Sequence, residues 1–234
     1  HCVIPCTLFA ASPQPPKTEA TVLIPVFNAP EDTRRLLARL SRTVAADQPI
    51  VIVDDGSDAP GLAADLARFA AARPGTRLVS HARNSGFVAA VNTGLAHLPE
   101  RGHVVLLNTD TLPPEGWLAR LLAPIAADPG IATVTPMSNA AEILSVPSPV
   151  AETPLTSALV DHVDAIARSL NPRHQELPTG IGFCMAINRV FLDQLGGFDP
   201  AFGKGYGEEV DWCLKARAIG GRHVALPGLF VGHK

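Results

Sequence analysis

Three acidic residues crowd into one short segment near the C-terminal end of the chain. The segment reads Tyr-Gly-Glu-Glu-Val-Asp-Trp, and its carboxyl groups belong to Glu208, Glu209 and Asp211. We expect a helix to begin at Glu208, and the dipole of its first turn favours an ionised carboxylate, the state that a general base requires. Acidic first turns also serve as plain capping. The glycine-rich approach at residues 203–207 and the flanking tyrosine favour a turn that faces a substrate.

Aromatic and acidic side chains follow two other segments that read as strands. Phe27 and Asn28 follow one β-branched run, and Asp54 and Asp55 end another and begin Asp-Asp-Gly-Ser. A carboxylate at such a strand end can accept the imide proton of uracil or thymine, or bind a ribose hydroxyl. An aromatic face can stack on a base. Asp and Gly are also ordinary turn residues, so a tight turn is the alternative here.

Asp110 is the predicted metal ligand. It ends the segment Leu-Leu-Asn-Thr-Asp, which follows a further apolar run. Hard cations such as Mn²⁺ and Mg²⁺ take carboxylate oxygen and leave positions open for a diphosphate. The alternative is a turn or helix-capping aspartate. His233 follows a short apolar run. A lone histidine is usually structural or solvated, and His233 becomes a candidate metal ligand only because the other motifs accompany it.

A glycine and two asparagines mark the segment around residues 83–94. Asn84 and Gly86 precede an apolar helix, and Gly86 can open that helix so that its backbone amides face an anion. Within the helix, Asn92 is a polar residue among apolar ones, and a bare buried amide would be costly. We expect Asn92 to bond a neighbouring loop or the site, and the structural role is favoured.

Alternating strands and helices must position these side chains. Five β-branched runs predict strands at residues 21–26, 50–53, 77–80, 104–107 and 131–134. The segments between them carry apolar residues at helical spacing. This alternation predicts an α/β fold with a mostly parallel central sheet flanked by helices, in which ligands bind beyond the carboxyl ends of the strands.

The pattern changes after residue 135. Prolines interrupt it, and then an amphipathic helix follows whose apolar residues are Leu155, Leu159, Val163, Ile166 and Leu170. We expect residues 136–177 to form an insertion or lid. A last unit follows, with a strand at 182–187, a short helix from Arg189 and a strand near 223–226.

The composition fits one globular domain without a polyionic partner. Of 234 residues, 47% are apolar, and the formal net charge is −3 with no basic stripe, which argues against nucleic acid as a partner. No apolar run reaches the roughly 18 to 20 residues of a membrane-spanning helix. We expect an N-terminal extension or linker at residues 1–19, a domain over 20–234, and a cytoplasmic protein. Cys2 and Cys6 resemble half of a metal site that no second pair completes, so inert thiols are expected.

Taken in order, these segments resemble the landmarks of family 2 glycosyltransferases, which have the GT-A fold. The matching segments are Ile-Pro-Val-Phe-Asn, Val-Asp-Asp-Gly-Ser, Asn-Ser-Gly-Phe with Asn-Thr-Gly, Leu-Asn-Thr-Asp, Gly-Phe-Cys-Met-Ala-Ile, Gly-Gly-Phe-Asp, Gly-Glu-Glu-Val-Asp-Trp-Cys and the terminal Gly-His. Each piece is unspecific alone, but eight in this order are hard to obtain by chance. Within the family, the rhamnosyltransferase-like group of bacterial polysaccharide enzymes is most similar.

The resemblance implies an inverting enzyme that moves a sugar from a nucleoside-diphosphate sugar to a hydroxyl of a saccharide or glycoconjugate. It implies a divalent cation, Mn²⁺ or Mg²⁺, at Asp110 with help from His233, and it puts Glu209 at the position of the catalytic base. Glu208 and Asp211 are the local competitors for that role, and Asp211 can also stabilise the oxocarbenium-like transition state. The donor-binding residues by this resemblance are Pro25, Phe27, Asn28, Asp54, Asp55, Asn84, Gly86 and Asn108.

Two positions depart from the family pattern. Asn108 replaces the first carboxylate of the Asp-x-Asp landmark, and Glu209 stands where an aspartate is usual, so its carboxyl group reaches one methylene further. Asn108, together with an end at Lys234 that leaves no room for an acceptor-side segment, motivates the alternative of a non-catalytic nucleotide-sugar-binding domain of a larger protein. A nucleotidyltransferase is disfavoured because the first strand is followed by Asn-Ala-Pro-Glu and not by a glycine-rich basic loop. A lipid-linked acceptor would bring the enzyme to the inner face of a membrane.

Overall fold

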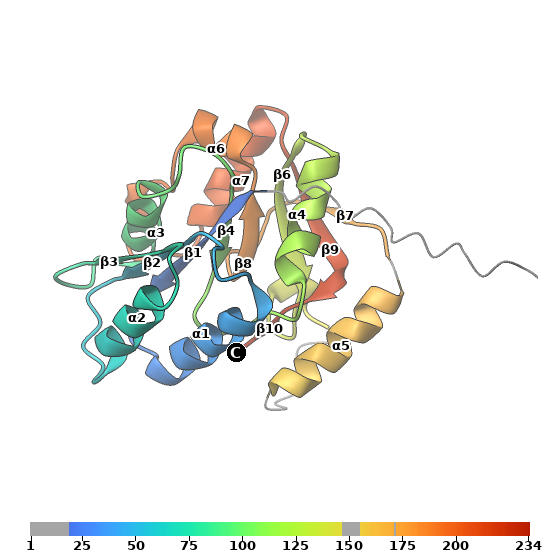
Figure 1. Cartoon of the computed structure of the whole chain (residues 1–234). Helices are drawn as coiled ribbons and strands as arrows, with labels where there is room; N and C mark the ends of the chain where they lie inside the picture. The colour runs from blue at the N-terminus through green and yellow to red at the C-terminus, as the bar shows by residue number, and fades with distance from the viewer. Residues whose placement is uncertain (1–18, 147–154, 171) are drawn as a thin grey trace, which may run out of the picture.

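A twisted eight-stranded sheet runs through the middle of the molecule in this computed structural model, which describes residues 19–146, 155–170 and 172–234 (Figure 1). The strand order is β3-β2-β1-β4-β8-β6-β9-β7. The strands are β1 (Ala20–Val26), β2 (Ile50–Asp54), β3 (Thr76–Ser80), β4 (His103–Leu107), β6 (Ile131–Met137), β7 (Gln175–Leu177), β8 (Cys184–Ile187) and β9 (Arg222–Phe230). A second, two-stranded sheet pairs β5 (Thr111–Leu112) with β10 (Gly232–His233). The predicted extension up to residue 18, with Cys2 and Cys6, lies outside the described residues.

The mostly parallel sheet predicted from the sequence is confirmed. Strands β3, β2, β1 and β4 are mutually parallel, and β6 is parallel to β9. Two strands run the other way: β8 is antiparallel to β4 and to β6, and β7 is antiparallel to β9. The sequence did not reveal this because a buried apolar run looks the same in either direction.

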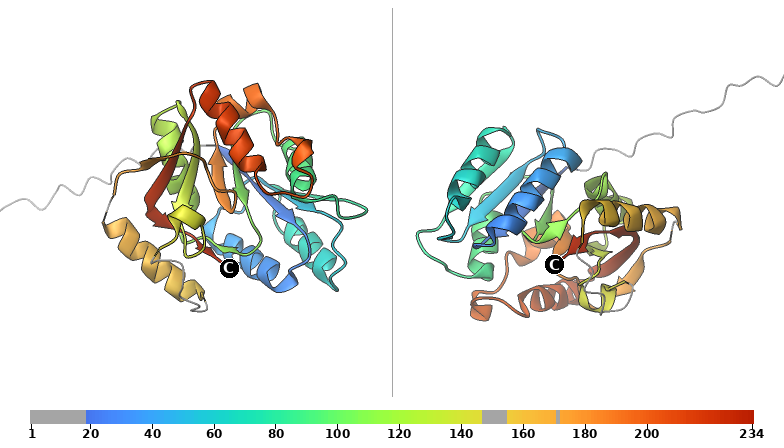
Figure 2. Two further views of the ribbon diagram at one scale, coloured as in Figure 1. Left: turned by 180° about the vertical axis from the view of Figure 1, so that it is seen from behind. Right: turned by 90° about the horizontal axis from the view of Figure 1, so that it is seen from below.

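Helices cover both faces of the sheet (Figures 1 and 2). One face packs against α1 (Pro30–Thr43), α2 (Leu62–Ala71) and α4 (Trp117–Ala127), and the other packs against α3 (Phe87–Leu95), α6 (Arg189–Leu195) and α7 (Glu208–Ala218). Successive residues of β1 serve the two faces in turn, since Val22 and Ile24 pack with the first group and Leu23 with the second. The parallel strands are therefore buried on both sides and hold their carboxyl ends at one edge.

Helix α5 (Ser157–Ser169) packs against β9 and forms a small cluster with Leu112 and Phe230. The helix was predicted, but the expected burial of two residues of its apolar stripe is wrong, because Ile166 and Leu170 are 50% and 73% exposed. Asp164 is buried instead. Its carboxylate lies 2.6 Å from Arg120 and accepts the N–H of Phe230 at 2.9 Å. An ion pair thus anchors the helix where an apolar contact was expected.

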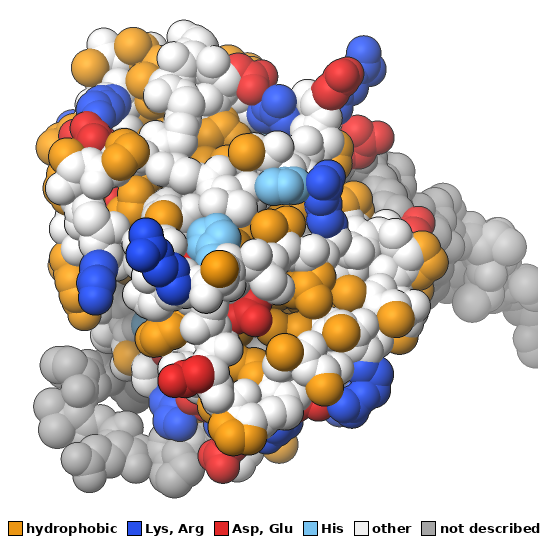
Figure 3. Space-filling model, turned by 90° about the vertical axis from the view of Figure 1, so that its left-hand side faces the viewer, with side chains coloured by type: hydrophobic (Ala, Val, Ile, Leu, Met, Phe, Trp, Pro, Cys, Tyr) orange, Lys and Arg blue, Asp and Glu red, His pale blue; other side chains and the backbone are white. Residues whose placement is uncertain are grey.

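Charged side chains are dispersed over the face of the molecule that carries the β3 edge. Lys and Arg side chains on this face lie among acidic and apolar ones and do not gather into one patch (Figure 3). This face therefore carries no continuous basic stripe.

Candidate active site

The loops after β1 and β2 hold each other through side chains that the sequence assigned to donor binding. Asn28 has a φ of 54°, and its amide oxygen accepts the N–H groups of Asp58 and Ala59 at 3.1 and 3.0 Å. Asp54 accepts the N–H of Ser57 at 3.0 Å. Neither Asn28 nor Asp54 lines the cavity described below. Both side chains therefore fix the loops, and the turn alternative is the better interpretation for these two.

Asp55 lies deeper and is only 2% exposed. Its Oδ1 lies 2.6 Å from His81 Nδ1 and accepts the N–H of Ser85 at 2.9 Å, while its Oδ2 accepts the N–H of Gly86 at 2.8 Å. The next amide, that of Phe87, donates to the carbonyl of Lys204 at 3.2 Å. The amides at Ser85 and Gly86 therefore face an anion, but that anion is the Asp55 carboxylate of the protein itself.

A cavity of about 340 Å³ opens beyond the carboxyl ends of β1 and β2, and we call it the strand-end cavity. It is lined by Pro25, Val26, Phe27, Asp55, Asn84, Gly86, Phe87, Ala90 and Lys204. Five of the predicted donor-binding residues thus lie together, and Phe27 is 48% exposed with a face free for stacking. Lys204 was missed, since the sequence gives no signal that the later glycine-rich loop reaches this cavity.

That glycine-rich loop joins the cavity to the start of α7. A Cβ at Gly86, which has a φ of 95°, would lie 2.8 Å from Lys204 Cα, so the loop needs glycine there. A Cβ at Gly205 would lie 3.6 Å from Phe87 Cβ and 3.9 Å from the carboxylate oxygens of Glu208. The acidic first turn of α7 is therefore a neighbour of the strand-end cavity.

The three carboxylates of that turn have different surroundings. Glu208 is 4% exposed, and burial, followed by the nearby charge of Glu209, raises its pKa against backbone amides that lower it. For Glu208, burial thus acts against the effect expected of the helix dipole. Asp211 is partly exposed, and its Oδ2 lies 2.6 Å from Lys215 Nζ. Asp211 is thus placed as the ion-pair partner of Lys215.

Glu209 lies on the side of α7 that faces the sheet. Its Oε1 is 4.0 Å from where a Cβ of Gly182 would be, just before β8. Its Oε2 is buried and has no hydrogen-bond partner among the described residues. An unpaired buried carboxylate oxygen is costly unless a ligand satisfies it. Glu208 Oε2 is likewise buried without such a partner among the described residues, so what sets Glu209 apart is its position beside the start of β8.

Asp110 and His233 meet at the end of β4. Asp110 Oδ1 is buried without a hydrogen bond among the described residues, and its nearest partner is His233 Nε2 at 3.4 Å. The strand pairing of β10 with β5 sets His233 opposite Thr111. The imidazole stacks on Phe183 with 4.9 Å between ring centroids, and its Nδ1 donates to the carbonyl of Ala140. Nε2 therefore carries the lone pair that a metal needs.

The charge state of His233 depends on Asp110. Burial lowers the pKa of His233, but the contacts with Asp110 and with the Ala140 carbonyl outweigh burial, so the pKa lies above its usual value.

The backbone N–H of Asn108 donates to the carbonyl of Phe183 at 2.9 Å. Among the described residues, no three His, Cys, Asp or Glu side chains form a metal cluster. Of these residue types, Asp110 and His233 are the pair that meets here.

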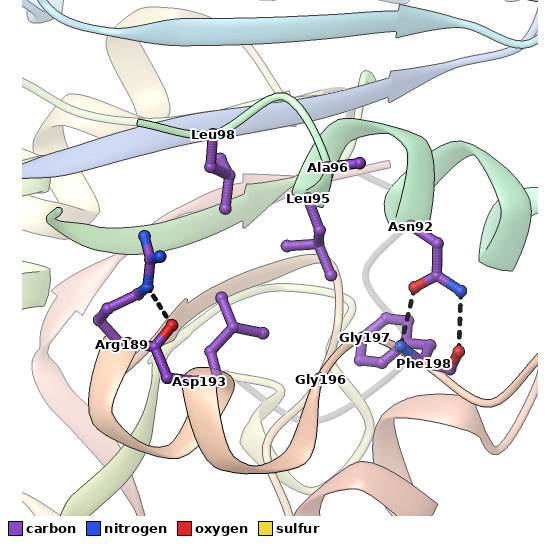
Figure 4. Close-up of a pocket in the computed structure, with 10 residues that line it drawn as sticks. Asn92, Leu95, Ala96, Leu98, Arg189, Asp193, Gly196, Gly197 and Phe198 are labelled. Carbon is purple, nitrogen blue, oxygen red and sulfur yellow. Dashed lines mark hydrogen bonds and ion pairs between the residues drawn. The ribbon is translucent and has the colours of Figure 1, made fainter. Parts of the chain in front are cut away.

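A larger cavity, of about 420 Å³, lies elsewhere, between α3 and α6 (Figure 4). Asn92 borders it, donating to the carbonyl of Phe198 and accepting its N–H, both at 2.8 Å. The ion pair of Arg189 and Asp193 lies along the same wall (Figure 4). The structural interpretation of Asn92 is confirmed. No other predicted site residue lines this cavity, so its size does not make it the active site.

The mostly parallel sheet covered by helices on both faces, with a cavity at the carboxyl ends of its parallel strands, has the GT-A fold. The chain belongs to glycosyl transferase family 2, whose family model matches residues 21–196. A probable N-acetylgalactosaminyltransferase 7 of Caenorhabditis elegans is 31% identical over 206 residues, which are 80% of this chain and 33% of that protein. An undecaprenyl-phosphate 4-deoxy-4-formamido-L-arabinose transferase of Edwardsiella ictaluri is 37% identical over 119 residues, covering 47% of this chain and 34% of that protein.

Solved structures support the same fold. That of GalNAc-T7 with UDP, GalNAc and Mn²⁺ aligns with a TM-score of 0.72 and 21% identity, over 92% of this chain and 44% of the other. Mannosyltransferase PcManGT of Pyrobaculum calidifontis, in complex with GDP-Man and Mn²⁺, aligns with a TM-score of 0.65 and 22% identity, over 92% and 56%. The chain spans about a third of the length of the curated relatives it matches. Within the described residues, no helix is long and apolar enough to cross a membrane.

Proposed function

We propose that the chain is the catalytic domain of an inverting, metal-dependent glycosyltransferase that moves a sugar from a nucleoside-diphosphate sugar to an acceptor hydroxyl. The observation that carries the proposal is a continuous path of neighbours along one edge of the sheet. It runs from the strand-end cavity through the loop before α7 to Glu209, and from there through the start of β8 and Phe183 to His233. This path links the proposed base pocket, the proposed catalytic carboxylate and the proposed metal position.

The donor nucleotide is proposed to carry uracil or thymine. Asp55 lines the strand-end cavity, and its Oδ2 accepts only one backbone N–H. A carboxylate oxygen has a second lone pair, which can accept the imide N–H of either base. Phe27 offers an exposed ring on which the base can stack.

The metal position fits a divalent cation in part. A buried carboxylate oxygen on Asp110 without a hydrogen bond, facing the imidazole Nε2 of His233, is a suitable pair of ligands for Mn²⁺ or Mg²⁺. The amide of Asn108 follows the same strand and is proposed to bind the donor. When bound, the cation would neutralise charge on the departing diphosphate.

Glu209 is proposed as the general base. Its carboxylate takes the proton of the acceptor hydroxyl while the acceptor oxygen bonds to the anomeric carbon. The bond from that carbon to the diphosphate breaks in the same step, so the configuration inverts. Glu208 is proposed to support Glu209 and not to act as the base, since its burial disfavours the ionised form.

The acceptor and the cellular setting are also proposals. We propose a saccharide or glycoconjugate acceptor and a role in polysaccharide or glycoconjugate synthesis. The relative named as an undecaprenyl-phosphate transferase supports a lipid-linked acceptor, and with it a peripheral position at the cytoplasmic face of a membrane. The relatives named as N-acetylgalactosaminyltransferases give no support to the narrower rhamnosyltransferase-like group.

A thermal-shift panel tests the donor proposal. Uridine and thymidine diphosphates, and sugars of either, should raise the melting temperature by about 5–10 °C at roughly a hundred times their Kd, and more with Mn²⁺ than without. Stabilisation by guanosine diphosphate, with none by the two pyrimidine nucleotides, would show that the assignment of Asp55 and Phe27 is wrong.

A further inference from the structure

A histidine outside every sequence motif holds the carboxylate that lines the strand-end cavity. His81 follows β3, and its Nδ1 lies 2.6 Å from Asp55 Oδ1, while its Nε2 lies 2.9 Å from the hydroxyl oxygen of Thr93 on α3. Both side chains of the pair are sheltered, with 18% of His81 and 3% of Asp55 exposed. Side chains from the end of β2, the end of β3 and helix α3 are therefore linked, with His81 between Asp55 and Thr93.

The direction of these hydrogen bonds follows from their chemistry. An ionised carboxylate only accepts, so Nδ1 of His81 donates to Asp55 in either protonation state of the ring. In the neutral ring Nε2 then accepts a hydrogen bond from the hydroxyl group of Thr93, which fixes the orientation of the ring. The result is a chain from α3 through His81 to Asp55 that ends at the cavity wall.

His81 decides which oxygen of Asp55 is left for a ligand. Oδ1 accepts from His81 and from the Ser85 amide, which uses its two lone pairs. Oδ2 accepts from the Gly86 amide alone and keeps one lone pair. Without His81, each oxygen would accept one backbone amide and each would have a lone pair to offer.

We infer that His81 is a positioning residue for nucleobase recognition, holding Asp55 so that its Oδ2 accepts the imide N–H of a uracil or thymine base. The inference rests on the donor site proposed above. A histidine needed only for folding would not have to face the cavity carboxylate, because the Ser85 and Gly86 amides already compensate the burial of Asp55. What His81 adds is a fixed orientation, which is the usual contribution of a residue behind a binding group.

Ligand methylation gives a test that separates positioning from folding. Calorimetric titration would compare UDP with N3-methyl-UDP, which lacks the imide proton. Wild-type protein should prefer UDP. His81→Leu should lose about tenfold in affinity for UDP, the worth of one hydrogen bond to a charged group, and less than about twofold for N3-methyl-UDP. His81→Asn should restore most of the preference, because its amide nitrogen occupies the place of Nδ1.

Two further variants complete the experiment. His97→Leu is the matched control, because His97 bonds the carbonyl of Thr93 at 2.8 Å on the same helix but does not reach Asp55. It should leave the ratio of the two affinities unchanged. Thr93→Val should lower the affinity for UDP about threefold and leave the affinity for N3-methyl-UDP unchanged. This variant replaces His81→Leu in the experiment if His81→Leu does not fold.

The outcomes separate two failures. An equal loss for both ligands in His81→Leu, or in Thr93→Val, would mean that His81 serves folding alone and would overturn the inference. A wild-type protein that binds both ligands equally, or binds neither, would instead refute the proposed donor site, and the inference would fall with it.

Discussion

At the residue scale, one helix turn carries three carboxyl groups with three different environments. Glu208 and Glu209 each have a buried oxygen without a hydrogen bond among the described residues, but only Glu208 is buried as a whole side chain, and Asp211 pairs with Lys215. Their types and spacing are visible in the sequence, but their environments are not, because burial depends on the loop that folds over the turn. The geometry favours Glu209 for chemistry.

Replacing Glu209 with glutamine tests that role. Glu209→Gln should lower the rate of transfer to an acceptor by about 10²- to 10⁴-fold, the usual cost of losing a general base, with donor affinity and melting temperature nearly unchanged. The matched variants are Glu208→Gln and Asp211→Asn, and the latter removes only a surface pair worth roughly 0–1 kcal/mol. A far larger loss of turnover in either of these, at equal donor affinity, would transfer the base role to that residue.

The raised pKa of Glu208 predicts a pH dependence of stability. A carboxyl group with a raised pKa binds its proton more tightly in the folded state, so the protein should lose stability as pH rises from the unfolded value near 4.5 through the folded pKa. Glu208→Gln removes this titration. Chemical denaturation between pH 4 and 8 should therefore show the variant gaining stability relative to wild type as pH rises. A constant difference across that range would contradict the assigned burial effect.

For Asp55, the sequence predicted the position of the residue but not the residues around it. Its position at a strand end was predicted, and it does line the cavity. Its partner His81 and its neighbour in the cavity wall, Lys204, were not predicted, since they come from segments whose approach depends on the folded chain. Asn28 and Asp54 carry the same kind of signal, yet their side chains hold turns, because short polar side chains serve both uses.

At the scale of elements, periodicity predicted most strands and helices and missed the short ones. The five predicted strands and the helices between them are present with ends shifted by up to a few residues. Strands β5, β7 and β10 have two or three residues each, too few to show a period. The second sheet that holds His233 beside Asp110 is built from two of these, so the metal position could not be located by pattern alone.

The tie between α3 and the loop after α6 predicts a purely structural mutant. Asn92→Ala leaves the N–H and carbonyl of Phe198 without their partner and should lower the free energy of unfolding by about 1–3 kcal/mol, with donor affinity unchanged. Gln194→Ala is the control, since that exposed amide only bonds the carbonyl of Val190 and should change stability by less than about 0.5 kcal/mol. Loss of donor binding in Asn92→Ala at full stability would instead place Asn92 in the site.

At the scale of the whole molecule, parallel strands bring distant segments to one edge. Asp55, Asp110 and Glu209 lie far apart in the sequence, and the fold brings Asp55 to the strand-end cavity, Asp110 to His233 and Glu209 to the start of β8. The alternation of strands and helices was enough to predict that edge. It was not enough to predict how α5 docks, because that docking depends on the ion pair of Arg120 and Asp164.

The central claim is that the chain is catalytic and does not only bind a nucleotide sugar. The most direct measurement is release of nucleoside diphosphate from UDP-GalNAc, UDP-GlcNAc and thymidine-diphosphate rhamnose, with Mn²⁺ or with a chelator, by the wild-type chain and by Asp110→Asn. We predict slow release that needs the metal with at least one donor, and loss of the metal-dependent release in the folded variant. Unchanged Mn²⁺ dependence in Asp110→Asn would remove that residue from the metal position. Binding of these donors without any release in Mn²⁺ would contradict the claim and make the chain a non-catalytic nucleotide-sugar-binding domain.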